Sequence, residues 1–233
     1  MKKIIAVALL FVMVCSLNFV QAEIKGYDEK TRTYQYVAFG QYPQGAEGEI
    51  KPILWRVLEA DDEKVYLLSE YILFAKAVHS VYLEFHNDFK LDVRKTEMFL
   101  HLNDGFMKEA FTAEQQMKMV EEPEHGWVSL PSVADIKNPA YGFVEDKDRR
   151  GYGTPYALNH LLFMYGNESS PYWTRDYSTS QDGSMRCTKV QGNTGFIRCQ
   201  SIDLGARPVI WLKTAALMEA TGEGTRENPF IME

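Results

Sequence analysis

Three strand-like runs stand close together in the last third of the chain and restrict the fold class. They are Met185–Val190, Gly195–Ser201 and Ala206–Leu212, and each is rich in apolar or β-branched residues. The first two flank a short turn at Gly192-Asn193, which favours a hairpin, because short turns join antiparallel strands. This end of the chain therefore predicts a mixed or antiparallel sheet.

Two further strand signals come early in the chain. Thr33–Phe39 is rich in Tyr, Val and Phe and stops at Gly40. Ile53–Glu59 and Lys64–Ser69 form a predicted hairpin around an acidic tip. Clustered carboxylates at a loop tip are typical of a solvated turn, so we expect no metal there.

Helix signals occupy the middle of the chain. Thr112 followed by Gln115 predicts a capping box that opens a short helix burying Met117 and Val120. Before it, apolar residues recur every four positions and predict an amphipathic helix: Met98, Leu102, Phe106 and Ala110.

A further helix is predicted after the charged segment Glu145–Gly153, which we expect to be an exposed loop. Thr154-Pro155 supplies an N-cap and a first helical residue, and Gly166 is the predicted end. The inward face of this helix is predicted to carry Leu158, Leu161, Leu162 and Tyr165.

The order of these signals predicts the fold class. Strands come first, then helices, a short strand at Trp127–Leu130, helices again and finally strands. Segregated runs of this kind favour α+β over alternating βαβ units. We expect a single domain over residues 23–233, with a core at about 33–213 and a tail at 214–233.

The first 22 residues predict export. Lys2 and Lys3 precede an apolar run from Ile4 to about Val14, and small residues end the segment at Ala22, as in a secretory signal peptide. The apolar run is shorter than the ~20 residues of a spanning helix, so a membrane anchor is the weaker reading. We expect the protein to be periplasmic or secreted, with no membrane span after cleavage.

Charge argues against two classes of partner. The chain has 25 Lys and Arg, of which 23 remain without Lys2 and Lys3, against 32 Asp and Glu, a net charge of −9. An acidic chain without a basic cluster does not predict binding to nucleic acid or to an anionic membrane. The partner stays unidentified, a cell-envelope or extracellular ligand being one option.

Two cysteines follow the predicted signal peptide. Cys187 and Cys199 lie symmetrically about residue 193, so a hairpin centred there would place them opposite each other. We expect a structural disulfide, which in the chain-entropy model contributes on the order of 3 kcal/mol. A redox-active pair is the alternative, although neither cysteine lies in a CxxC motif.

No catalytic motif is present in the sequence. There is no nucleophile elbow, phosphate loop or zinc signature, and the five histidines have no ligand spacing with the cysteines. We therefore name no catalytic residue and expect no metal and no cofactor. A Ser/His/Asp triad assembled in space stays open, because triads are recognised by geometry.

The candidate ligand-binding residues are Tyr172, Trp173, Arg175 and Arg207. Arg207 precedes the apolar run Val209–Leu212, and an arginine in that place needs a carboxylate such as Asp203 or a ligand anion. We favour the internal ion pair. Tyr172 and Trp173 beside Arg175 could stack on a ligand, although buried aromatics of this kind are more often part of a core.

Six short motifs, taken in order, resemble one protein family. This is the domain of unknown function 6273, whose members are bacterial, exported or surface-attached. The motifs are Phe39-Gly40-Gln41-Tyr42-Pro43, Ile53-Leu54-Trp55-Arg56-Val57-Leu58, Tyr66-Leu67-Leu68-Ser69, Leu102-Asn103 with Phe106 and Ala110-Phe111, Tyr172-Trp173-Thr174-Arg175, and Gly205-Ala206-Arg207-Pro208.

The resemblance implies a compact C-type-lectin-like α+β fold, like that of formylglycine-generating enzymes, with a twisted, mostly antiparallel sheet. Residues 222–230 also resemble a segment that closes such domains, and they predict a turn before a last short strand. Cys187 and Cys199 do not have the spacing of the enzyme's cysteines. We therefore expect a non-enzymatic binding or envelope-associated module, with an enzyme distantly related to formylglycine-generating enzymes as the alternative. Its ligand surface is expected on loops near Trp173, Arg175 and Glu145–Gly153.

Overall fold

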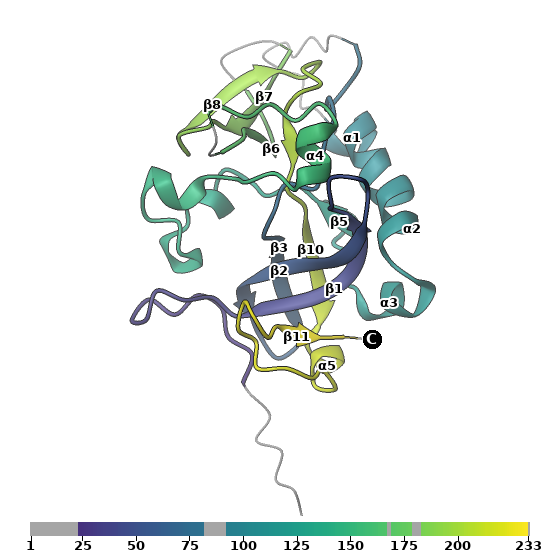
Figure 1. Cartoon of the computed structure of the whole chain (residues 1–233), viewed down its shortest axis with the longest axis vertical. Helices are drawn as coiled ribbons and strands as arrows, with labels where there is room; N and C mark the ends of the chain where they lie inside the picture. Colours follow the sequence, from purple (N-terminus) through teal and green to yellow (C-terminus); the bar gives the residue numbers. More distant parts are fainter. Residues whose placement is uncertain (1–22, 82–91, 167–168, 179–182, 233) are drawn as a thin grey trace, which may run out of the picture.

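The fold is α+β, as the sequence predicts, with two β-sheets and a few short helices (Figure 1). The computed structural model describes residues 23–81, 92–166, 169–178 and 183–232. The predicted signal peptide, residues 1–22, lies outside the described residues. None of the described helices has the length and apolar character that crossing a membrane requires.

The larger sheet has six strands in the order β11-β1-β2-β3-β10-β5. Neighbouring strands are antiparallel except β1 and β11, which are parallel. The sheet is therefore mixed, as predicted. Its strands are β1 (Tyr36–Pro43), β2 (Ile50–Ala60), β3 (Lys64–Ser69), β5 (Val128–Ser129), β10 (Val209–Lys213) and β11 (Phe230–Ile231).

The predicted hairpin between residues 53 and 69 is confirmed as β2 and β3. Asp61 shapes its tip, because the Oδ1 atom accepts hydrogen bonds from the backbone N–H groups of Glu63 and Lys64, both at 2.8 Å. β10 then pairs with the other edge of β3, with Val209 opposite Leu68. A strand from the end of the chain thus lies inside a sheet built mainly by its beginning.

The smaller sheet has five strands in the order β4-β9-β6-β7-β8. Its pairs are antiparallel except β6 and β9, where Tyr172 lies opposite Gly205 in a parallel pair. The predicted hairpin at residues 185–201 is confirmed as β7 and β8. The strands are β4 (Phe74–Ala75), β6 (Tyr172–Tyr177), β7 (Ser184–Thr188), β8 (Thr194–Arg198) and β9 (Gly205–Ala206).

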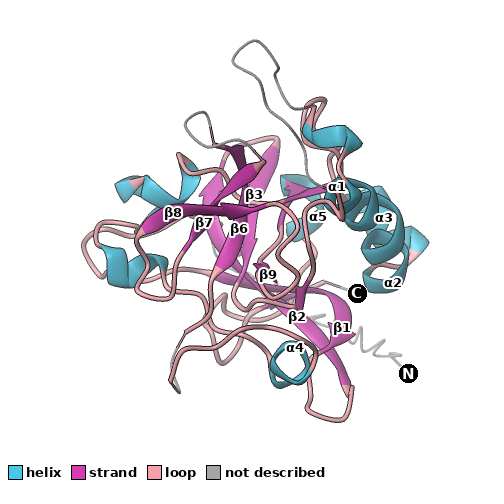
Figure 2. Ribbon diagram, turned by 90° about the horizontal axis from the view of Figure 1, so that it is seen from above, coloured by secondary structure: helices cyan, strands magenta, loops and turns pink. Residues whose placement is uncertain are grey.

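The predicted amphipathic helix is confirmed at residues 97–110. It begins at Thr96, whose side chain caps the backbone N–H of Phe99, and its apolar stripe is buried against the larger sheet. Figure 2 shows this helical segment on one side of the sheets. It consists of α1 (Glu97–Leu100), the π-helical turn η2 (His101–Phe106) and α2 (Met107–Ala110), and a short 3₁₀ turn, η1 (Val93–Lys95), precedes it.

The next helix, α3 (Ala113–Lys118), opens with the predicted capping box between Thr112 and Gln115. The prediction of its buried face is wrong for Met117, which is 67% exposed. The helix lasts only six residues, so its apolar face is too short to order Met117 against the core.

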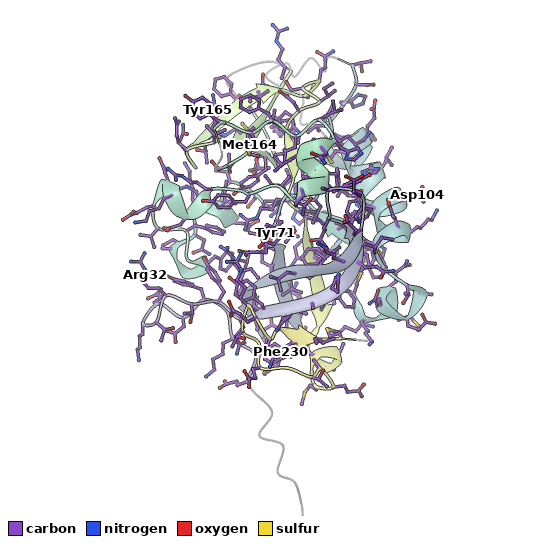
Figure 3. The ribbon with its side chains drawn as sticks, in the orientation of Figure 1. Arg32, Tyr71, Asp104, Met164, Tyr165 and Phe230 are labelled. Atoms are coloured by element: carbon purple, nitrogen blue, oxygen red, sulfur yellow. The ribbon has the colours of Figure 1, made fainter. Side chains whose placement is uncertain are left out.

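α4 (Pro155–Asn159) begins at the predicted N-cap, Thr154, but the predicted end at Gly166 is wrong. Leu161 has φ +74°, a left-handed conformation that stops the helix two residues after Asn159. Leu162 is therefore buried, whereas Leu161 and Tyr165, predicted to face inward, are exposed. Figure 3 shows Met164 and Tyr165 at the surface of this segment.

The larger sheet buries residues on both faces. One face packs with the helical segment in the main core, which includes Trp55 and Phe106. The other face carries a smaller apolar cluster, in which Phe143 packs on side chains of β2, β3 and β10. Phe143 belongs to a connection with three 3₁₀ turns, η3 (Asp135–Lys137), η4 (Pro139–Tyr141) and η5 (Asp146–Arg149), followed by residues 150–153. Where this connection meets the sheet, two pockets are found, one lined by Arg175 and the other by Arg207. The last helix, α5 (Thr214–Leu217), follows β10.

Candidate functional site

Trp173 lies in the core and not on a ligand surface. Its side chain is 0% exposed, and its Nε1–H group donates a hydrogen bond of 2.9 Å to the carbonyl oxygen of Lys76. It packs among the residues that fill the main core. The interpretation of Trp173 as a stacking platform for a ligand is therefore wrong, because both of its faces are covered by protein.

Arg175 and Arg207 lie in different places. Arg175 approaches the Asp135 carboxylate at 3.1 Å and donates to the carbonyl oxygen of Leu130 at 3.0 Å. It lines a pocket of about 250 Å³ beside Tyr66 and Trp211. Two predicted ligand-binding arginines are thus separated by the structure, and Arg175 has an internal carboxylate partner.

Arg207 is buried, and no carboxylate of the described part of the chain forms a salt bridge with it. The side chain is 1% exposed, and its Nε–H group donates a hydrogen bond of 2.8 Å to the carbonyl oxygen of Ser69. Its guanidinium lies over the ring of Tyr172, 5.5 Å from the centroid. The Nη1 atom is buried and has no hydrogen-bond partner among the described residues.

The favoured ion pair between Arg207 and Asp203 is wrong. Among the described residues, no salt bridge joins them, and the Asp203 carbonyl oxygen accepts from the backbone N–H of Phe163 instead. Asp203 lies in the turn before β9, whereas Arg207 extends the line of β10 and faces β3. A guanidinium in this place can donate to a ligand anion.

Tyr172 forms part of the support of Arg207. The side chain is fully buried, and its hydroxyl donates a hydrogen bond of 2.8 Å to the carbonyl oxygen of Arg149. The ring is therefore held in place under the Arg207 guanidinium, where the two can make a cation–π contact. Of the four predicted ligand-binding residues, Arg207 is the one that combines deep burial with an unfilled donor.

Arg207 lines a pocket of about 330 Å³ on the second face of the larger sheet. We call it the arginine pocket. Its lining includes six cationic side chains and two carboxylates. The cations are Arg32, Arg56, Lys147, Arg150, Arg207 and Arg226, and the carboxylates are Glu70 and Asp148. Its remaining lining residues include Tyr27, Tyr34 and Tyr152.

Strand register explains how three of these residues meet. Arg56 lies opposite Leu68, and Leu68 lies opposite Val209, so these side chains share one face of the sheet. Side chains two residues apart on a strand point to the same face. Glu70 and Arg207 therefore extend the same face beyond Leu68 and Val209, toward each other.

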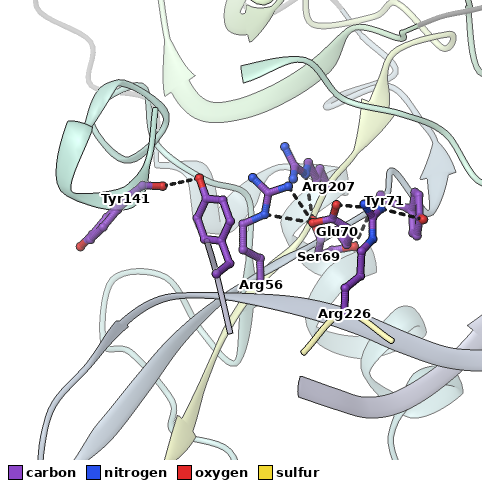
Figure 4. A network of polar contacts seen from close by, with 8 residues as sticks. Arg56, Ser69, Glu70, Tyr71, Tyr141, Arg207 and Arg226 are labelled. Atoms are coloured by element: carbon purple, nitrogen blue, oxygen red, sulfur yellow. Dashed lines mark hydrogen bonds and ion pairs between the residues drawn. The ribbon is translucent and has the colours of Figure 1, made fainter. Parts of the chain in front are cut away.

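Glu70 is shared by two arginines (Figure 4). One of its oxygens accepts from Arg56 at 2.9 and 2.8 Å, and the other lies 3.1 Å from Arg226, which also reaches the Tyr71 hydroxyl at 3.0 Å. Burial by itself lowers the pKa of Arg56, but the Glu70 carboxylate and nearby tyrosines raise it above its ordinary value. Arg56 is thus charged, and Glu70 serves two cations at once.

Tyrosines form part of the pocket wall. The rings of Tyr27 and Tyr34 lie 4.8 Å apart between centroids, and the Arg56 guanidinium lies over the Tyr34 ring at 4.2 Å. The Tyr27 side chain accepts a hydrogen bond from Arg32 and thereby raises the pKa of Arg32. The wall therefore offers aromatic surface next to fixed positive charge.

The two cysteines are not joined by a disulfide, so that prediction is wrong in the structure. The hairpin register pairs Cys187 with Gly195, and the backbone N–H of Cys199 reaches the carbonyl oxygen of Gly183. The hairpin is centred near residue 191, which separates the cysteines by four positions along the strand. Burial raises the pKa of the Cys187 thiol to about 11, so it is protonated at neutral pH.

We expect both thiols to resist alkylation in the folded protein and to react after unfolding without a reductant. Both side chains are fully buried, and a thiol with a pKa of about 11 has little thiolate at pH 8. Peptide mass mapping after iodoacetamide treatment, with and without guanidinium chloride, measures this at each cysteine. Absence of alkylation at both cysteines after unfolding would show that they are bridged.

Sequence reasoning located part of the pocket and missed the rest. It named Arg207 and the segment Glu145–Gly153, and Lys147, Asp148, Arg150 and Tyr152 of that segment line the pocket. It missed Arg56, Glu70 and Arg226. A signal for two of them was available, because a charged residue in or directly after an apolar strand needs a partner. Arg56 lies within the run ILWRVLE, and Glu70 ends the run YLLSE.

Within the described ranges, no three His, Cys, Asp or Glu side chains form a group that could hold a metal ion. No known protein family matches the chain, and neither a curated protein nor a solved structure is detectably similar to it.

Proposed function

We propose that the chain is an exported, non-enzymatic binding module that holds a small anionic ligand in the arginine pocket. The observation that carries the proposal is Arg207, whose buried Nη1 donor has no partner among the described residues and lies beside a pocket lined by six cations and two carboxylates. A buried guanidinium without a counter-ion is costly, and an anion that enters the pocket removes that cost.

The charge of the pocket contrasts with that of the whole chain. The full sequence has a net charge of −7, yet the pocket lining has an excess of four positive charges. Low-dielectric walls focus such a local field and attract a ligand of opposite sign. Arginine is suited to this task, because its planar donors bind carboxylate and phosphate oxygens in pairs.

We also propose that the fold is C-type-lectin-like and related to the domain of unknown function 6273. The α+β architecture with two mixed sheets supports this. Several motifs that carry the resemblance form the core, for example Trp55, whose Nε1–H donates to the carbonyl oxygen of Phe39 at 2.7 Å. In the motif Gly205-Ala206-Arg207-Pro208, the arginine reaches the pocket.

Calorimetric titration of the protein lacking residues 1–22 tests the anion site. We expect glucuronate and glucose 6-phosphate to bind and glucose to show no binding, because glucose has the same size but no charge. Raising the salt concentration should weaken binding by both anions, since screening reduces the attraction to the pocket. Binding of glucose equal to that of the anions, or no binding by either anion, would contradict the proposal.

A further inference from the structure

We infer that the arginine pocket is selective for a doubly charged phosphate monoester over anions with a single charge. The inference rests on the proposed anion site and adds the chemical class of its ligand. It is carried by the charge balance of the lining and by the geometry around Glu70. The absence of histidine from the described lining makes it testable by a change of pH.

The charge balance requires more than one negative charge. Lys147 is paired with Glu145 at 2.7 Å, and Arg150 also makes a contact within the protein, so neither is counted. Four lining arginines, Arg32, Arg56, Arg207 and Arg226, then stand against Glu70 and Asp148, which leaves an excess of two. A single carboxylate or sulfate ester leaves one charge uncompensated in a partly buried site, whereas a phosphate dianion leaves none.

The Glu70 carboxylate is held by two other arginines, which leaves Arg207 for the ligand. Glu70 already lies between Arg56 and Arg226, and its side chain is 7% exposed. Arg207 is the third guanidinium beside this pair, and its Nη1 atom donates to no partner among the described residues (Figure 4). A phosphate monoester has three terminal oxygens, so it can accept from Arg207 and from the outer arginines at the same time.

The pocket has room for more than the phosphate group. A volume of about 330 Å³ exceeds what one phosphate needs and is within the range of small-ligand sites. Tyr27, Tyr34 and Tyr152 supply aromatic surface with hydroxyl groups, which suits a small polar ring such as a sugar. We therefore assign the ester's organic part to this wall and the phosphate to Arg207.

No histidine is among the described residues that line the pocket, and this makes the ligand's own titration measurable. The titratable groups facing the ligand are the carboxylates Glu70 and Asp148, the three tyrosines, Lys147 and the arginines. The second ionisation of a phosphate monoester lies near pH 6. A sulfate ester stays singly charged throughout and reports any change in the protein itself.

The test compares glucose 6-phosphate with glucose 6-sulfate by calorimetry at pH 8 and pH 5. At pH 8 we expect the phosphate ester to bind about tenfold more tightly or better, as expected for an added charge-assisted contact. At pH 5 only about a tenth of the ester is a dianion, so its affinity should fall about tenfold while that of the sulfate ester stays constant.

Three outcomes overturn the inference. Equal affinity for the two esters at pH 8 would show that the second charge of the phosphate does not contribute to binding. An equal fall in the affinity of both esters at pH 5 would show that the pH effect arises from the protein. Inorganic phosphate that binds as tightly as glucose 6-phosphate would show that the organic part is not held. In each case binding of the anions still supports the proposed function, whereas no binding by any of them refutes the anion site itself.

Discussion

Replacing Trp173 with alanine is expected to lower the free energy of unfolding by about 3–5 kcal/mol, as is typical when a large buried aromatic side chain is truncated. The whole ring is removed from contact with the main core, and the surrounding residues belong to two sheets that cannot both relax into the space. The carbonyl oxygen of Lys76 also loses its hydrogen-bond donor. Both effects act in the same direction.

Denaturant unfolding followed by far-UV circular dichroism measures this change. Tyr165→Ala is the matched control, since Tyr165 is 67% exposed and its substitution should stay within about 0.5 kcal/mol of the wild type. If Trp173→Ala leaves the unfolding midpoint unchanged, the ring is not part of the core. That result would support the original prediction that Trp173 binds a ligand at the surface.

Local features of the fold were the ones that the sequence predicted well. Asp61 at the β2–β3 tip and the N-caps Thr112 and Thr154 act through hydrogen bonds to residues two or three positions away. Such contacts need no information about distant parts of the chain. The segregated order of strand and helix signals then sufficed for the α+β class.

Features that depend on register or on distant contacts were predicted poorly. The disulfide was inferred from symmetry about residue 193, but the turn after β7 centres the hairpin near residue 191. A register change alters every cross-strand pair, so a small error in the turn removes the pairing of the cysteines. The exposed face after α4 was missed because the left-handed residue Leu161 carries no sequence signal for that conformation.

The arginine pocket required the larger sheet to be assembled. Arg207 contacts Ser69 across 138 positions of sequence, and Arg226 reaches Tyr71 across 155. Both contacts depend on β10 lying beside β3 and on the C-terminal strand lying beside β1. Sequence patterns can mark a charged residue near a buried strand, but the partner it faces follows from strand order.

Replacing Arg207 with methionine is expected to weaken binding of glucose 6-phosphate by roughly 10- to 150-fold. A hydrogen bond to a charged group contributes about 1.5–3 kcal/mol, and every 1.4 kcal/mol is a factor of ten in affinity. Arg207→Lys keeps the positive charge but not the planar pair of donors, so its affinity should lie between those of the wild type and Arg207→Met.

Stability and binding must be measured together for Arg207, because its removal has two opposing effects on folding. The carbonyl oxygen of Ser69 loses its donor, which destabilises the fold. A buried cation that forms no salt bridge with the described residues is removed as well, which stabilises it. Titrations are therefore run at a temperature where circular dichroism shows each variant to be folded.

Arg198→Met, an exposed position on β8 that does not line the pocket, is the matched control for the loss of one positive charge. If Arg207→Met binds the ester as the wild type does, while Arg198→Met is also unchanged, the anion site lies elsewhere. If both variants weaken binding equally, the effect comes from net charge and not from the donor that Arg207 presents.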